Sequence, residues 1–311
     1  MKTSPHTRSC FVCAVSRRQF LVGALALAAA GSGAALPQPI RKCQPRIAGS
    51  LWSYNARESA DWGRGGWRKE LKRQAELGFD LLWIANAPAA VANPEDLASF
   101  TRLLDLCAER KVKVILGIDG GRLWYQRLDA ERELAECGGS IAAIGERFAG
   151  HPAFWAWYIP HEIYRCWDQM DAYIQKLYPA LVERCKRAAS LPVTLSPFFI
   201  LDRDKIYGDF RFSEPEDYAR YWAGLIRRSG FDIVMLQDSG EHFSYVTNDM
   251  RRPFFQAMSE ACRQGGARFW GNAECAEFEC PTKDEFVKRY GRTHPNSVKD
   301  APWRPVPIER L

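Results

Sequence analysis

Two glutamates stand at the ends of apolar runs that have the composition of buried strands. Glu162 closes the run F-W-A-W-Y-I-P-H-E, and Glu274 closes the run R-F-W-G-N-A-E. Cleavage of a glycosidic bond requires such a pair, because one carboxylic acid protonates the leaving oxygen while the other attacks the anomeric carbon or activates water. The aromatic residues before Glu162 would desolvate it, raise its pKa and suit it to the acid/base role. Glu274 is then the expected nucleophile, and Glu277 and Glu279 remain open as alternatives.

Other polar and aromatic residues near the predicted strand ends are candidates for binding a sugar. Flat aromatic rings stack on the apolar faces of pyranoses, and amide, carboxyl and imidazole groups can hydrogen-bond to hydroxyls. Tryptophan is also an ordinary core residue, and a glutamate at a strand end can instead cap a helix or pair with an arginine. The expected substrate-binding residues are Trp52, Asn86, Asp119, Trp157, His161, Gln237, Asp238, Trp270 and Asn272.

The sequence predicts no cofactor and no metal site. The pair Cys275 and Cys280 lacks a second Cys/His pair at the spacing of a zinc site, and no EF-type loop is present. No glycine-rich phosphate loop follows a predicted strand. Cys107, Cys185 and Cys262 fall in helical patterns and are expected to be small buried residues, although an even number of cysteines in an exported chain also permits disulfides.

Apolar runs alternate with amphipathic helical patterns from residue 46 onward. The predicted strands are 46–53, 79–86, 112–119, 154–162, 192–199, 232–238 and 267–274. The predicted helices are 67–77, 94–111, 141–148, 170–189, 215–228 and 253–264.

The strands are continuous apolar runs, as expected of parallel strands buried on both faces. Regular β-then-α order, with polar residues at nearly every strand end, favours a closed (β/α)8 barrel of the TIM type over a doubly wound sheet. Seven strands are recognisable. The residues after Glu279 contain one short helical pattern and a proline-broken tail without a clear eighth strand, so the barrel is expected to be incomplete at its C-terminal end, or closed by a short strand there.

The N-terminal segment S-R-R-Q-F-L is followed by an uncharged run at 22–36 that is rich in Ala, Leu and Gly. Twin arginines, a mildly apolar region and the small residues G-A-A are typical of a bacterial twin-arginine export signal, with cleavage expected near Ala35. The Tat export machinery is therefore an expected partner, and the periplasm or the exterior the expected location. The run is too short and too weakly apolar to be a good membrane span, so no stable anchor is expected.

This assignment divides the chain into an export signal at 1–35, a linker at 36–45 and a barrel at 46–311. The signal carries four basic residues and no acid, and it therefore accounts for most of the formal net charge of +6. The remaining charge gives no reason to expect nucleic acid or anionic lipid as a partner.

Several segments of the chain resemble a known family: G-S-L-W, L-G-F-D-L-L-W-I, V-I-L-G-I, H-P-A-F-W-A-W-Y-I-P-H-E-I, L-S-P-F-F, D-I-V-M-L-Q-D and F-W-G-N-A-E. The resemblance is to DUF4434, a family of glycoside-hydrolase-like TIM barrels, and it covers about 47–279. It implies the barrel fold and places Glu162 and Glu274 where retaining barrel hydrolases carry their acid/base and nucleophile. His161 departs from the wider superfamily, which has an Asn there that contacts the sugar 2-hydroxyl.

We therefore expect an exported glycoside hydrolase that acts on a poly- or oligosaccharide. A catalytically inactive carbohydrate-binding barrel is one alternative. A periplasmic structural or partner-binding protein, in which both glutamates are structural, is another. A carboxyl separation of about 5 Å would predict retention of anomeric configuration, and a wider gap would predict inversion.

Overall fold

The computed structural model describes residues 11–14, 46–52, 54, 56–92, 94–121, 123–238 and 243–307, with only the backbone described at 11–14 and 56–64. Seven parallel strands form its sheet, and each pairs with the next along the chain. They are β2 (Arg46–Trp52), β3 (Leu81–Ile84), β4 (Lys113–Gly117), β5 (Phe154–Ile159), β6 (Val193–Leu195), β7 (Ile233–Gln237) and β8 (Arg268–Ala273). All seven predicted strands are present, and the TIM-type fold is confirmed.

The gap between the first and last parallel strands is filled by β1 (Phe11–Ala14). This strand runs antiparallel to both neighbours, and Phe11 pairs with Ser50 of β2 and with Ala273 of β8. The ring is thereby closed, and neither β2 nor β8 is left with an unpaired edge. The closing strand comes from the N-terminal segment assigned above to the export signal, so the expectation of closure or a gap at the C-terminal end is corrected.

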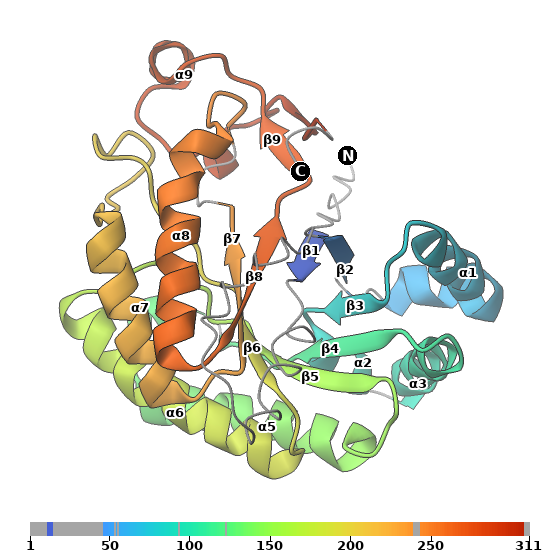
Figure 1. Ribbon diagram of the computed structural model, residues 1–311. Coiled ribbons are helices and arrows are strands. Elements are labelled where there is room, and N and C mark those ends of the chain that lie inside the picture. Colours follow the sequence, from blue (N-terminus) through green and yellow to red (C-terminus); the bar gives the residue numbers. More distant parts are fainter. Residues whose placement is uncertain are drawn as a thin grey trace, which may run out of the picture.

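Helices cover the outer side of the sheet, as Figure 1 shows for α1, α3 and α5 to α8. Each long helix follows a strand, and such β-α-β units place their helices on the outer side of a parallel barrel. The helices are α1 (Ala56–Glu76), α2 (Ala87–Val91), α3 (Pro94–Glu109), α4 (Trp124–Arg127), α5 (Ala130–Phe148), α6 (Asp168–Ala188), α7 (Pro215–Ser229) and α8 (Asn248–Gly265). The structure extends α1 and α5 well beyond their predicted starts.

Two hydrophobic cores lie on the two faces of the sheet. The inner core fills the barrel with side chains that include Trp83, Ile115, Tyr158, Met235 and Trp270. The larger outer core lies between the sheet and the helices. Because side chains alternate between the faces of a strand, strands β3, β4, β5 and β7 each place buried apolar residues in both cores, and this explains their uninterrupted apolar runs.

The C-terminal residues form a small unit beside the barrel. Strands β9 (Ala276–Phe278) and β10 (Trp303–Pro305) pair antiparallel, and the helix α9 (Lys283–Tyr290) packs with them. Its aromatic core includes Phe243, Phe278 and Phe286. The short predicted helix after Glu279 is therefore confirmed.

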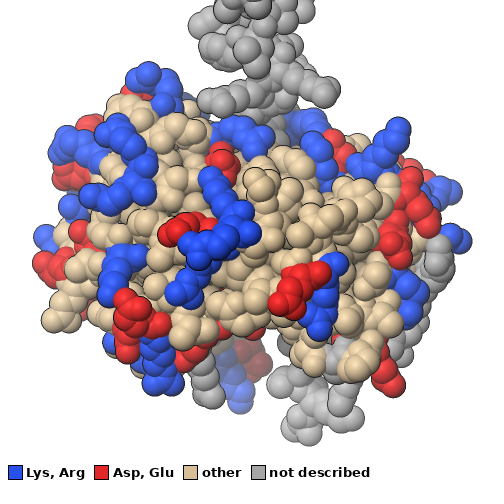
Figure 2. Space-filling view, turned by 90° about the horizontal axis from the view of Figure 1, so that it is seen from below, with Lys and Arg blue, Asp and Glu red and all other residues tan. Residues whose placement is uncertain are grey.

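Cys107, Cys185 and Cys262 are buried as expected, and every cysteine whose side chain the structure describes is a free thiol. Among the described residues, no helix combines the length and apolar composition needed to span a membrane. Figure 2 shows acidic and basic groups interspersed over one face of the molecule.

Candidate active site

The carboxyl ends of the parallel strands all open at one rim of the barrel. Residues that follow different strands therefore meet there although they are far apart in sequence. Gln237 ends β7 and lies beside Asn272 of β8 in the strand register. Glu162 follows β5 by three residues. The structure thus brings together three of the predicted site residues.

The carboxyl group of Glu162 is held by two neighbours. The Tyr158 hydroxyl donates a hydrogen bond to Oε1, and the Gln237 side chain also hydrogen-bonds to the carboxyl. Glu162 remains exposed through the mouth of a pocket, but the protein around the carboxyl penalises ionisation. This desolvation raises the pKa of Glu162, while the two hydrogen bonds act in the opposite direction. A carboxyl group of this kind can keep a proton for a leaving group.

A buried polar network supports Gln237. Its Nε2 donates to the Ser196 carbonyl at 3.0 Å, and Asn272 Nδ2 donates to Ser196 Oγ at 2.9 Å. The same hydroxyl donates to the Met235 carbonyl at 2.8 Å. These bonds fix the amide that faces Glu162. The buried Oδ1 atom of Asn272 has no hydrogen-bond partner within the described part of the chain.

Glu162 lines a pocket of about 490 Å³. The wall is rich in aromatic rings, which suits it to stacking against a sugar. Sequence reasoning did not select most of these residues, because they belong to loops or to the starts of helices α4 and α6 rather than to strand ends. The segment I-Y-R-C-W-D, which directly follows Glu162 and contains two aromatic residues, was the feature of the sequence that could have indicated this wall. The lining residues are Trp124, Tyr125, Glu162, Ile163, Tyr164, Cys166, Trp167, Asp168, Met170, Phe198 and Arg211.

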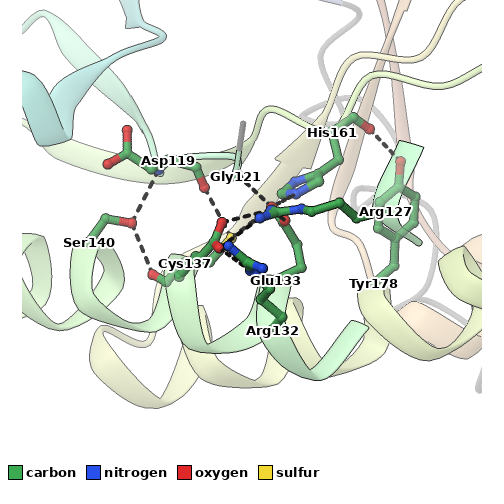
Figure 3. Close-up of polar contacts among 10 residues, drawn as sticks. Asp119, Gly121, Arg127, Arg132, Glu133, Cys137, Ser140, His161 and Tyr178 are labelled. Carbon is green, nitrogen blue, oxygen red and sulfur yellow. Dashed lines mark hydrogen bonds and ion pairs between the residues drawn. The ribbon is translucent and has the colours of Figure 1, made fainter. Parts of the chain in front are cut away.

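His161 points away from this pocket, into the interior. Its Nε2 lies 2.6 Å from Glu133 Oε1, and both side chains are buried (Figure 3). The backbone N–H of Gly121 donates to the same oxygen at 2.6 Å, and Arg127 Nη2 lies 3.1 Å from Oε2. The Tyr178 hydroxyl donates to the His161 carbonyl. His161 therefore anchors the backbone beside Glu162 and does not contact a sugar, which corrects the expectation from sequence.

The ionisation state of Glu133 follows from these contacts. Burial would raise its pKa, but the hydrogen bonds from His161 and from Gly121 outweigh it, and the pKa is lowered. An ionised carboxylate only accepts hydrogen bonds, so Nε2 of His161 carries the donated proton.

Glu133, Cys137 and His161 together present ligand atoms of the types that bind metals, all within 4.8 Å of one another. The surroundings argue against a cation there. Donors already point at Glu133, and the Arg127 guanidinium lies against it. Burial also raises the pKa of the Cys137 thiol, which keeps it protonated. The cluster is better described as a hydrogen-bonded anchor (Figure 3).

Three other predicted polar residues lie at the rim in different roles. Asn86 donates to the Tyr54 carbonyl at 2.7 Å and accepts from the Tyr54 N–H at 2.5 Å. Its amide therefore fixes the backbone at Tyr54. Asp238 lies against the buried Arg251, whose Nε donates to the Asp238 carbonyl. The Asp119 residue is exposed overall, but the protein around its carboxyl partly desolvates the group and raises its pKa. In Figure 3 this carboxyl points away from the Glu133 network.

The three predicted tryptophan platforms lie outside the pocket. The Trp157 ring is fully buried in the outer core and donates to the Ala189 carbonyl at 3.2 Å. Trp52 stacks on Trp67 of α1, with ring centroids 5.2 Å apart. These two expectations fail because the residues point to the helical side of their strands.

Trp270 does point into the barrel, but it is buried and stacks on Trp155 with ring centroids 5.7 Å apart. Lys113 and Arg268, which begin β4 and β8, lie over the Trp155 ring. The stack therefore belongs to the amino-terminal end of the barrel, opposite the rim, and Trp270 is not a platform.

The alternatives for the second carboxylate have structural partners. Arg304 of β10 lies 2.9 Å from Glu277 Oε1 and 3.1 Å from Glu279 Oε1. Both glutamates thus tie β9 to β10, and Glu277 is buried. Glu274 directly follows β8 at the rim and is only partly buried. Its position in the chain makes it the better candidate.

A comparison with one solved structure supports the fold. The chain is similar to a candidate α-L-fucosidase from Bacteroides thetaiotaomicron VPI-5482, with 17% identity and a TM-score of 0.59 over 86% of this chain and 89% of the other. It also matches an endo-β-1,4-mannanase from Thermotoga petrophila, with 14% identity and a TM-score of 0.42 over 73% and 67% of the two chains. An endoglucanase from Pseudomonas stutzeri gives 16% identity and a TM-score of 0.41 over 65% of each chain.

No match was found among curated proteins. Residues 47–294, most of the chain, match the family described as a domain of unknown function, DUF4434. The protein therefore belongs to the DUF4434 family and shares its TIM-type fold with the candidate α-L-fucosidase.

Proposed function

We propose that this protein is a glycoside hydrolase in which Glu162 is the general acid/base and Glu274 the second carboxylate. The carrying observation is the position of Glu162 in a pocket walled by aromatic rings, with a raised pKa and hydrogen bonds from Tyr158 and Gln237. A protonated acid beside a surface suited to pyranose stacking is what departure of a sugar leaving group requires.

The chemistry assigned to this site uses two carboxyl groups of the chain and a water molecule. Glu162 would donate its proton to the glycosidic oxygen as the bond to the anomeric carbon breaks. Across a short gap between the two carboxyls, the Glu274 carboxylate would attack that carbon and form a glycosyl-enzyme ester; Glu162, now a carboxylate, would then take a proton from the water that hydrolyses the ester. Across a wider gap, Glu274 would instead take a proton from a water molecule that attacks the anomeric carbon directly. Gln237, fixed by Ser196, would keep the Glu162 carboxyl in place through both steps.

A screen of the purified protein against a panel of neutral and acidic polysaccharides tests this proposal. Wild type is expected to release reducing ends from at least one glycan, and Glu162→Gln to lose this activity while keeping its fold. Glu183→Gln is a matched control, because Glu183 is an exposed acid on α6 that pairs with Arg187 one turn away. Binding without cleavage would indicate the inactive carbohydrate-binding barrel, and cleavage unaffected by Glu162→Gln would overturn the assignment.

We further propose that the protein is exported by the twin-arginine pathway, on the strength of the S-R-R-Q-F-L segment. Cleavage near Ala35 would remove β1 and leave β2 and β8 without the strand between them. N-terminal sequencing of the protein from the periplasmic fraction tests the cleavage. Replacing Arg17 and Arg18 by lysine is expected to retain the precursor in the cytoplasm, and undiminished export of that variant would contradict the proposal.

A further inference from the structure

The pocket that contains Glu162 has an unusual arrangement of cations in its wall. The guanidinium carbons of Arg165 and Arg211 lie 4.3 Å and 4.7 Å from the centroid of the same indole ring, that of Trp167. Trp167 and Arg211 both line the pocket. Two like charges are therefore held against one ring beside the proposed acid/base.

Within the described part of the chain, neither guanidinium has a strong counter-ion. The buried Nε and Nη1 atoms of Arg165 have no hydrogen-bond partner among the described residues. Arg211 Nη1 lies 3.8 Å from Asp168 Oδ2, and both side chains are largely exposed. Exposed pairs at such distances contribute little stability. A ligand anion could replace Asp168 at small cost, and would gain a planar donor fork in return.

The adjoining elements are compatible with an anion. Helix α6 begins at this wall, and its N-cap residue, Trp167, provides no side-chain hydrogen bond to the first turn. The carboxyl of Glu162 has a raised pKa, which reduces the negative charge that a ligand anion would meet in the pocket. The aromatic wall would still hold the apolar face of a sugar ring.

We propose that the pocket binds a uronic acid unit of an acidic glycan, with its carboxylate on Arg211 and its ring against the aromatic wall. The inference rests on the proposed function for the location of the site, but it concerns which sugar enters. Arg165 supports the position of Trp167 from the interior and adds positive charge. A neutral sugar would bring no anion to the two guanidinium groups.

Calorimetric titration of the full-length Glu162→Gln protein tests this inference without turnover. The probes are oligogalacturonate, oligomannuronate and oligoguluronate, each paired with its carboxyl-reduced counterpart. At least one uronate is expected to bind, and to bind roughly tenfold or more tightly than its reduced form, as for a charge-assisted pair. Added salt should weaken the acidic ligand selectively.

Adding Arg211→Gln is expected to abolish the preference for the acidic form, with the circular dichroism spectrum unchanged because Arg211 is exposed. Arg220→Gln is the matched control, since Arg220 is an exposed residue of α7 paired with Asp217. Equal affinity for acidic and reduced ligands, or no uronate binding, would overturn the inference. Binding of a sulfated carrageenan oligosaccharide without any uronate would also overturn it.

Failure of this inference can be told apart from failure of the proposed function. Uronates that bind but are not cleaved by the wild type would leave the inference standing and contradict the hydrolase. If the wild type cleaves neutral glycans without preferring acidic ones, and Glu162→Gln loses this cleavage, the proposed hydrolase stands and the uronic acid inference is wrong.

Discussion

Glu133 and Glu162 lie on either side of one stretch of backbone, and their environments differ in kind. Glu133 is buried and accepts hydrogen bonds from His161 and Gly121, with the Arg127 guanidinium beside it, so its pKa is lowered. Glu162 has two neutral hydrogen-bonding neighbours and faces a pocket, and its pKa is raised. The first carboxyl has the surroundings of a structural anchor. The second has a raised pKa and an open side, which the proposed role as general acid requires.

The largest expected effect comes from Glu162→Gln. Loss of the proton donor should lower hydrolysis of a natural glycan by about 10³-fold, within the range that general acid/base catalysis contributes. The thermal midpoint should not fall, because the wild-type carboxyl is held where its ionised form is penalised. Initial rates measure the loss of activity, and a thermal melt measures whether stability is kept. A large drop in stability would place Glu162 in the structural class with Glu133.

Glu133→Gln should produce the opposite pattern. Removing one partner of a buried charged cluster costs about 3 kcal/mol of unfolding free energy. His161 and Arg127 would both face a neutral amide in place of the carboxylate, although Arg127 keeps its ion pair with Glu136. Chemical denaturation measures the change, with the exposed Glu131→Gln on the same helix as a control. A variant as stable as wild type would show that the Glu133 cluster is not an anchor.

The two carboxyls should respond to pH with opposite signs. Glu133 has a lowered pKa, so its contribution to stability is present above the unfolded value and is lost as the pH falls through the folded value. Glu162 has a raised pKa, so both stability and catalysis by the protonated acid are lost as the pH rises through it. Plotted against pH, the unfolding free energy should fall on the acidic side because of Glu133, and both activity and unfolding free energy should fall on the alkaline side because of Glu162. Glu133→Gln should remove only the acidic limb, and Glu162→Gln only the alkaline limb. If the alkaline limb of the stability profile is unchanged in Glu162→Gln, the assignment of a raised pKa to Glu162 is wrong.

The smallest expected effect is that of Tyr158→Phe. The variant keeps the ring that packs edge-on against Trp83 and loses only the hydroxyl that donates to Glu162. Since that hydrogen bond lowers the pKa of Glu162, its loss should move the alkaline limb of activity to higher pH. One neutral hydrogen bond is worth about 1 kcal/mol, so the rate should change by less than about tenfold. A limb that moves to lower pH would contradict the described contact.

Much of this architecture could be predicted from the sequence. The seven apolar runs gave the strands in order, and parallel packing then forced Glu162, Gln237 and Asn272 to one rim. The closing strand β1 could not be predicted, because its composition in isolation is that of an export signal. Barrel closure depends on pairing with two strands distant in sequence.

The aromatic residues were harder to place than the carboxyls. Trp52 and Trp157 point to the helices and Trp270 to the far end of the barrel, because side-chain direction depends on register and bulges that composition does not reveal. A shift of register between β4 and β5 is one such irregularity. Trp167 was missed since it lies in a loop, where no period indicates direction.

The contrast between the two carboxyls can be measured without knowing the substrate. A pH titration of side-chain carboxyl ¹³C resonances would follow both groups in wild type, with Glu162→Gln and Glu133→Gln identifying the two signals. Glu162 is expected to titrate above the ordinary glutamate value of 4.5, and Glu133 below it. A Glu162 signal that titrates at or below that value would contradict its role as the acid.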